Sequence, residues 1–177
     1  MQLRLFGAVA AAFIAATACG GVVGGAGTTQ TPLADASSPP LSLSSDTTGK
    51  TVSFTLVAGY NGANSGFNFD GYSAGSVEID VPQGWSVTVT CSNKGPLNHS
   101  CAVVSDETAS QPLFTVATTP NPGAGLAAGQ QATFTFKPDR TGTFRVACLV
   151  PGHEPQGMWI YFRVVGSGSP AAYTVSA

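Results

Sequence analysis

The fold is decided by residues 76–91, which read SVEIDVPQGWSVTVTC. Apolar and polar side chains alternate through 76–81 and again through 86–91, which is the pattern of a β-strand with one buried face. Five further stretches are expected to form strands: 51–57, 100–105, 133–136, 142–149 and 158–165. Turn residues separate these stretches, and none has the helical period. Seven to eight short strands in about 120 residues predict an all-β protein, an antiparallel β-sandwich.

The composition fits a soluble domain of this kind. The chain has 177 residues, of which 43% are hydrophobic and only 9% are charged, with 22 Gly and 12 Pro. This balance is too apolar for a disordered chain and too rich in turn-forming residues for a helical bundle. The chain has 7 Lys and Arg against 9 Asp and Glu, and the basic residues are scattered singly, so nucleic-acid binding is excluded. Eight aromatic residues are expected in the core: Phe54, Phe67, Phe69, Trp85, Phe134, Phe136, Phe144 and Trp159.

The first residues predict export. Arg4 precedes the uncharged run 5–18, which is too short to span about 30 Å of membrane hydrocarbon. We therefore expect a signal peptide at 1–18. The sequence ATAC at 16–19 resembles a lipoprotein box and predicts lipidation of Cys19, which would anchor the protein to the outer face of the cytoplasmic membrane. The alternative is a soluble secreted or periplasmic protein, and either location permits disulfides.

The rest of the chain divides into three parts. Residues 19–49 are rich in Gly, Ser, Thr and Pro without apolar periodicity, so we expect a flexible tether, lipidated or free. Residues 50–166 contain the predicted strands and form the expected domain. Residues 167–177 are expected to be a short C-terminal tail.

Metal-ligand residues gather near the C-terminus. Residues 148–158 read CLVPGHEPQGM, in which Cys148, His153 and Met158 have the spacing C-x4-H-x4-M. His99, the other His of the chain, begins a predicted strand. Two imidazoles, a thiolate and a weak axial thioether form the ligand field of a blue-copper electron-transfer site. Zinc fits less well because its structural sites rarely take a thioether. The simplest alternative is a free buried Cys, a surface His and a core Met.

Several segments resemble sulfocyanin, a cupredoxin, over roughly residues 50–165. They are FNFDGY at 67–72, VPQGW at 81–85, Asn98-His99, VPGH at 150–153 and GMW at 157–159. The resemblance implies a Greek-key antiparallel β-sandwich with one type 1 copper ion. By position it implies that the ligands are His99, Cys148, His153 and Met158. The spacing of the last three is also similar to that of rusticyanin.

Two neighbours of His99 are expected to influence the metal site. Many blue-copper proteins have Asn directly after the upstream His, whereas this chain has Ser100, as rusticyanin does. The shorter hydroxyl is expected to change the hydrogen bonds near the thiolate, and such contacts tune the reduction potential. Asn98 completes an N-glycosylation sequon with Ser100, but a residue beside a metal ligand is a poor acceptor.

Cys91 and Cys101 are expected to form a disulfide. Strand alternation directs both side chains into the sandwich, and the expected export favours oxidation. Closing a loop of about ten residues stabilises a fold by roughly 3 kcal/mol in the chain-entropy model. The alternative is two unpaired thiols in the core.

Three classes of function follow from these residues. The first is a carrier that passes one electron between redox proteins of a respiratory or electron-transfer chain, which would dock near His153. The second is a non-catalytic copper-binding module for storage or delivery. The third is a copper enzyme, which needs further centres built from more His than the 2 of this chain, so we expect no enzyme. Small or apolar residues are expected to surround His153: Pro96, Leu97, Val150, Pro151, Gly152 and Pro155. Glu154 is expected to be a solvated loop carboxylate.

Overall fold

The structure, a computed structural model of the chain, describes residues 41–176. The expected signal peptide at 1–18 and the expected lipidation site Cys19 lie outside the described residues. Nine strands form in the described part: β1 (Ser42–Asp46), β2 (Thr51–Ala58), β3 (Val77–Pro82), β4 (Ser86–Asn93), β5 (Ala102–Val104), β6 (Gln131–Phe136), β7 (Gly142–Ala147), β8 (Trp159–Val165) and β9 (Ala172–Val175). One short 3-10 helix, η1 (Ala63–Gly66), follows β2.

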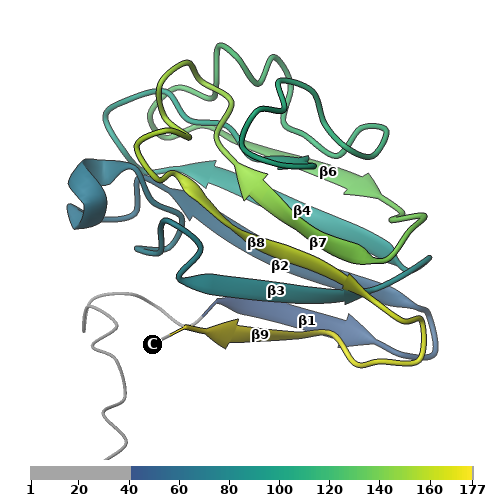
Figure 1. Cartoon of the computed structure of the whole chain (residues 1–177). Helices are drawn as coiled ribbons and strands as arrows, with labels where there is room; N and C mark the ends of the chain where they lie inside the picture. The colour runs from purple at the N-terminus through teal and green to yellow at the C-terminus, as the bar shows by residue number, and fades with distance from the viewer. Residues whose placement is uncertain (1–40, 177) are drawn as a thin grey trace, which may run out of the picture. The chain divides into compact units, whose positions relative to one another are not determined.

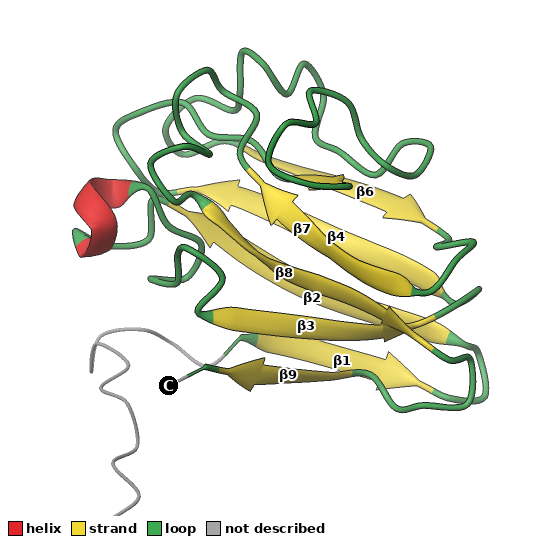
Figure 2. Ribbon diagram, viewed as in Figure 1, coloured by secondary structure: helices red, strands yellow, loops and turns green. Residues whose placement is uncertain are grey.

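The strands form two sheets that pack face to face (Figure 1). The first sheet has the order β1-β2-β4-β6 and the second has the order β5-β7-β8-β3-β9. Figure 2 shows that strands and loops make up nearly all of the described chain, which confirms the expected all-β sandwich. Two of the seven pairings are parallel, β2 with β4 and β3 with β8, and the other five are antiparallel.

Alternating side chains fill the space between the sheets. In β2 the buried residues are Val52, Phe54 and Leu56, and in β8 they are Ile160, Phe162 and Val164. The Phe54 and Phe162 rings meet across the two sheets with centroids 6.5 Å apart. Burying an aliphatic or aromatic side chain of this size stabilises the fold by about 1.5–3 kcal/mol. The two inner faces therefore form the core that the alternation predicts.

Seven of the eight aromatic residues expected in the core lie there or against it. Phe54, Phe69, Trp85, Phe134 and Phe136 are buried, whereas Phe67 and Phe144 are half-buried against the core. Trp159 does not lie in the core between the sheets, because its neighbour Ile160 points inward. It packs on the outer face of the second sheet against a smaller buried cluster of Ala102, Val104 and Ala147.

The ordered domain extends beyond the expected bounds of 50–166. β1 lies in the stretch 19–49 that we expected to be a tether, and β9 lies in the expected tail at 167–177. β1 pairs with β2, and β9 pairs with β3. Leu41 and Leu43 pack on the core with exposed Ser42 between them, but most side chains of both strands are exposed, so the alternation is too short to predict a half-buried strand.

The loops that carry the predicted ligands lie at one end of the sandwich. His99 follows the end of β4, and residues 148–158 connect the end of β7 to the start of β8. The first sheet therefore leads to one imidazole and the second sheet leads to the other three donors. Within residues 41–176, no helix is long and apolar enough to cross a membrane.

Candidate metal centre

Backbone hydrogen bonds fix the segment that carries His99. The His99 N–H donates to the Leu126 carbonyl at 3.1 Å, and the Leu126 N–H donates to the His99 carbonyl at 2.7 Å. Asn93, at the end of β4, is fully buried and supports the same segment. Its Nδ2 donates to the carbonyls of Leu97 and Leu126 at 2.7 Å each, and its Oδ1 accepts the Gly95 N–H at 2.9 Å.

Sequence reasoning missed Asn93. A buried Asn that bonds three backbone groups acts as the anchor of the turn at 93–96. The signal available in the sequence was the turn cluster Asn-Lys-Gly-Pro itself, in which Asn is a frequent side-chain acceptor.

The loop 148–158 is a series of tight turns that brings its three donor residues together. The His153 carbonyl accepts the N–H groups of both Gln156 and Met158 at 3.1 Å. The Cys148 N–H donates to the Met158 carbonyl at 3.1 Å, which places the first and last residues of the loop side by side. Gly152 and Gly157 have φ values of 86° and 88°, which glycine adopts without strain.

The donor atoms converge on one point. His99 Nδ1 lies 3.2 Å from His153 Nδ1, and Cys148 Sγ lies 3.4 Å from His153 Nδ1. One ligand atom from each of these three residues lies within 4.8 Å of the others, and all three residues are buried. Met158 is fully buried. The Phe67 ring packs edge-on against His153 with centroids 4.9 Å apart, which limits rotation of the imidazole.

Burial favours the neutral forms of the ligand residues. It lowers the pKa of His99 to about 4, with a further contribution from His153, and it also lowers the pKa of His153. Burial raises the pKa of the Cys148 thiol, and hydrogen bonds from Ser100 and Val150 oppose this rise. Both imidazoles therefore offer a free lone pair, whereas a metal must displace the proton of the thiol.

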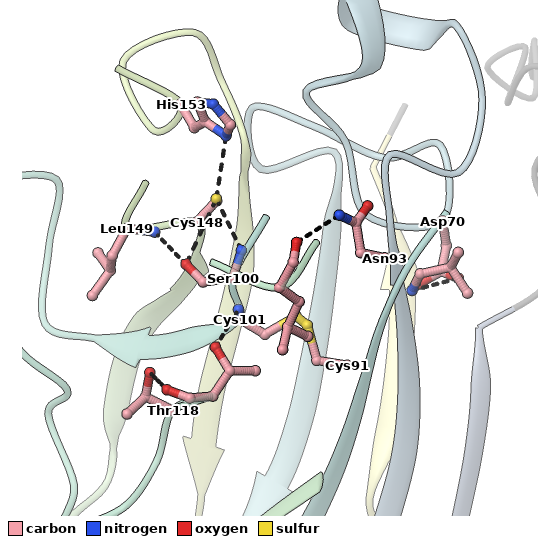
Figure 3. The surroundings of a disulfide bond; sticks show 12 residues. Asp70, Cys91, Asn93, Ser100, Cys101, Thr118, Cys148, Leu149 and His153 are labelled. Atoms are coloured by element: carbon pink, nitrogen blue, oxygen red, sulfur yellow. Dashed lines mark hydrogen bonds between the residues drawn. A yellow bond between two sulfur atoms is a disulfide. The ribbon is translucent and has the colours of Figure 1, made fainter. Parts of the chain in front are cut away.

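Ser100 contacts the thiol directly (Figure 3). Its N–H lies 3.2 Å from Cys148 Sγ, and its hydroxyl lies 3.7 Å from the same sulfur. The hydroxyl oxygen also accepts the Leu149 N–H at 2.9 Å. Asn98 has a different role, because its exposed side chain donates to the Ala124 carbonyl at 3.0 Å.

The disulfide between Cys91 and Cys101 is present in the structure (Figure 3). Both residues are fully buried, and their Cα atoms lie 6.1 Å apart. The bond ties β4 to the residue directly after Ser100. It therefore joins the core of the first sheet to the segment that presents His99.

The expectation that Glu154 is solvated is wrong. The residue is only 8% exposed, and its Oε1 lies 3.3 Å from the Arg145 guanidinium. Burial raises its pKa, and the Arg145 hydrogen bond and charge act in the opposite direction. In the sequence, Glu154 lies between the turn-forming residues Gly152 and Gly157, and nothing there indicates an ionic partner on β7.

The surface around the site is partly apolar. Pro96, Leu97, Pro151, Gly152 and Pro155 are exposed, and Val150 is half-buried. A cavity of about 320 Å³ lies beside the ligand loop, and its lining includes Cys148, Leu149, Val150 and Pro151. His153 is 9% exposed and is the most exposed of the four predicted ligands.

The donor set fits one type 1 copper ion. Two imidazoles and a thiolate are in place, and the thioether residue lies at the end of the same loop. A closed structural zinc site would need a fourth Cys or His, and the chain's two His are both used here.

Comparisons with known proteins agree with this geometry. The family model described as the sulfocyanin (SoxE) domain matches residues 38–176. Sulfocyanin from Sulfolobus acidocaldarius is 29% identical over 138 residues, which cover 71% of this chain and 69% of that protein.

Solved structures share the fold. Dithionite-reduced auracyanin from Roseiflexus castenholzii has a TM-score of 0.50 and 22% identity, covering 69% of this chain and 99% of that chain. A rusticyanin variant has a TM-score of 0.51 and 24% identity, covering 66% of this chain and 79% of that chain. The resemblance to cupredoxins expected from the sequence is confirmed.

Proposed function

The chain belongs to the sulfocyanin family, and from this membership and the donor set we propose that it carries single electrons through one type 1 copper ion. The proposed ligands are His99, Cys148, His153 and Met158. The observation that carries the proposal is a single buried thiol within reach of two imidazoles that burial keeps neutral. Bound at these residues, copper supplies one-electron chemistry between Cu(I) and Cu(II).

The protein residues have two tasks in this function. The sulfur donors of Cys148 and Met158 favour the reduced ion, whereas imidazoles suit both oxidation states. The backbone bonds within 148–158 and between His99 and Leu126 keep the donors in one arrangement. A fixed and buried site changes little when an electron arrives or leaves, which favours fast transfer.

The second candidate is a non-catalytic module for copper storage or delivery. Such a module must release its ion readily, and it usually offers several exposed Met or Cys ligands. Here the donors are buried, and the chain has only 2 Met and 4 Cys, of which two form the disulfide. These observations favour the electron carrier.

The third candidate is a copper enzyme, and the residues of the chain favour it less than an electron carrier. Copper oxidases and nitrite reductases combine a type 1 site with further copper centres that need several more His. Both His residues of the chain already face Cys148. A dinuclear centre would need a second Cys four residues after Cys148, and Gly152 occupies that position.

We propose that the protein works outside the cytoplasm, anchored by a lipid on Cys19. The signal-like run at 5–18, the sequence at 16–19 and the disulfide support this location. Mass spectrometry of the exported protein tests the anchor. A mature chain that begins at Cys19 and lacks acyl mass would exclude it and leave the soluble alternative.

We further propose that redox proteins dock near His153. The exposed residues Pro151, Gly152 and Pro155 flank this ligand and offer a small surface with little charge. Electron-transfer complexes use small and short-lived interfaces, for which such a surface is suited.

The visible absorption spectrum tests the central proposal. The protein is loaded with Cu(II) and measured before and after ascorbate, beside the variants Cys148→Ser and Ser105→Ala. We expect an intense blue band that ascorbate bleaches, that Cys148→Ser lacks and that the exposed control Ser105→Ala retains. A colourless protein that binds only Cu(I) or Zn(II) would overturn the electron-carrier function.

A further inference from the structure

Arg145 connects three segments around the ligand loop. It lies on the outer face of β7, with its side chain 19% exposed. Its guanidinium carbon is 3.8 Å from the centre of the Trp159 ring. Its two terminal nitrogens lie 3.3 Å from Glu154 Oε1 and 3.5 Å from Glu107 Oε2.

The contacts of Arg145 fall on the direct neighbours of two proposed ligands. Glu154 follows His153, and Trp159 follows Met158. The guanidinium therefore touches the chain one residue away from an imidazole donor and one residue away from the thioether donor. Arginine suits this position because its planar group can stack on an aromatic ring while it bonds a carboxylate.

The ion pair between Arg145 and Glu154 restricts the ligand loop because Glu154 is nearly buried. Residues 148–158 contain no Asp, Lys or Arg, and Glu154 is their one Glu. The Glu154 side chain is 9% exposed. A nearly buried carboxylate is strongly unfavourable without its partner, because its charge is then left without compensation. Loop conformations that separate Glu154 from Arg145 are therefore disfavoured.

The Phe67 ring packs against the His153 side chain, but the other described hydrogen bonds from outside the loop reach only its ends. Ser100 accepts the Leu149 N–H near its start, and the Asn64 Nδ2 donates to the Gln156 carbonyl at 2.7 Å near its end. The Ala74 N–H donates to the Gly157 carbonyl at 2.8 Å. The pair between Arg145 and Glu154 reaches the middle of the loop, where His153 lies.

We propose that Arg145 is a positioning residue for the metal centre. Fixed on the Trp159 ring, it holds Glu154 and thereby keeps His153 and Met158 in the metal-binding arrangement before the metal arrives. This inference rests on the proposed copper site. The inference adds to the proposed ligands a residue of β7 that affects the rate at which the site releases copper.

Copper release tests the proposal. The Cu(II)-loaded protein is mixed with excess EDTA, and the loss of the blue band is followed with time. Arg145→Gln is expected to release copper at least tenfold faster, in the range found when residues that support metal ligands are changed. Glu154→Gln is expected to act similarly, and the double variant should be little worse than either single variant, because both remove one interaction.

Arg163→Gln is the matched control. Arg163 also lies on the outer face of the second sheet and bonds two carboxylates, Asp80 and Glu78. None of its described contacts involves the ligand loop. Its removal should leave copper release unchanged. Arg145→Lys keeps the charge without the planar group and should fall between the wild type and Arg145→Gln.

Hydrogen exchange of the metal-free protein gives a second readout. Arg145→Gln should increase the exchange of the Gly157 and Met158 amides, which bond within the loop, and Arg163→Gln should not. Unchanged copper release and unchanged amide exchange in Arg145→Gln would overturn the positioning role, even if its melting temperature falls. If Arg145→Gln does not fold, copper release and amide exchange of Glu154→Gln and Arg145→Lys test the positioning role instead. A wild-type protein without a blue band would instead refute the proposed function, and the amide exchange would still test the loop.

Discussion

The backbone N–H of Ser100 points at Cys148 Sγ from 3.2 Å, while the hydroxyl of the same residue lies 3.7 Å from that sulfur. A thiolate that accepts hydrogen bonds donates less charge to a bound ion, which favours Cu(I) over Cu(II). Ser100→Ala removes the hydroxyl but keeps the backbone donor. We expect the reduction potential to fall by about 40 mV if that hydrogen bond is worth about 1 kcal/mol.

A redox titration followed by absorbance measures this change. Ser105→Ala is the control, because the Ser105 hydroxyl is exposed and bonds Asp106. A potential that stays the same or rises in Ser100→Ala would show that the hydroxyl does not act on the thiolate.

Gly59 and Gly95 leave room for the His99 ring. A Cβ at Gly59 would lie 2.7 Å from the Gly95 Cα and 3.1 Å from His99 Nε2, and Gly59 has a φ of 60°. We expect Gly59→Ala to destabilise the fold by about 1–3 kcal/mol and to weaken the blue band, because the imidazole must move. Gly62→Ala is the control, since nothing lies within 4 Å of its Cβ. Denaturant unfolding and absorption spectra measure both effects, and two variants with equal spectra would contradict the prediction.

The disulfide is expected to stabilise the fold rather than create the metal site. Replacing Cys91 and Cys101 together by Ala should lower the free energy of unfolding by about 3 kcal/mol, from the entropy of the closed loop. Urea unfolding of the metal-free protein measures this, in a Cys148→Ser background that removes the one free thiol of residues 41–176. The same double variant with Cys148 intact should keep its blue band at low temperature, and loss of the band in a folded protein would show a direct role.

Asp70 gives the fold a pH dependence that is separate from the ligands. Burial raises the pKa of Asp70 to about 7, and the Val57 N–H and Lys94 partly offset the effect. Burial raises the pKa of the nearby Tyr72 hydroxyl, and the charges of Tyr173 and Asp70 add to this rise. The unfolded chain loses this proton near pH 3.8, so the native state binds more protons between about pH 4 and 7. The contribution of Asp70 to stability is therefore greatest below this window and falls as pH rises through it, by up to about 4 kcal/mol. The lowered pKa of His99 acts in the opposite direction, so the contribution of Asp70 must be measured by difference.

Asp70→Asn isolates this contribution. Asn tolerates the φ of 53° at this position and keeps an oxygen that can accept the Val57 N–H. The variant should match the wild type near pH 3.5 and be more stable at pH 7. Chemical unfolding at several pH values measures the difference, with the exposed Asp46→Asn as control. Equal stability of wild type and Asp70→Asn at both pH values would refute the prediction.

The sequence predicted the features that depend on one strand at a time. The alternation in β2, β3, β4 and β6 located the core strands, because a half-buried strand exposes every second side chain. The spacing of Cys148, His153 and Met158 indicated the site because Cys, His and Met are scarce in this chain.

The sequence pattern did not predict the features that depend on a partner strand. β1 and β9 are held mainly by backbone pairing, and apart from Leu41 and Leu43 around the start of β1 their side chains are mostly exposed. The burial of Glu154 depends on Arg145, which lies on another element nine residues away. The parallel pairs β2–β4 and β3–β8 form because the chain crosses from one sheet to the other between the paired strands. The order of strands along the chain does not reveal where the chain crosses.

The place of β3 has a consequence for how the chain folds. β3 lies between β8 and β9, which are the last two strands in the sequence of the described residues. Until β8 has emerged, both edges of β3 are unpaired, which makes an unfinished chain prone to aggregate. Pairings between such distant segments also slow folding. The second sheet can therefore incorporate β3 only after β8, the strand that follows the loop with Cys148, His153 and Met158, is available, and a nascent chain must be kept from associating until then.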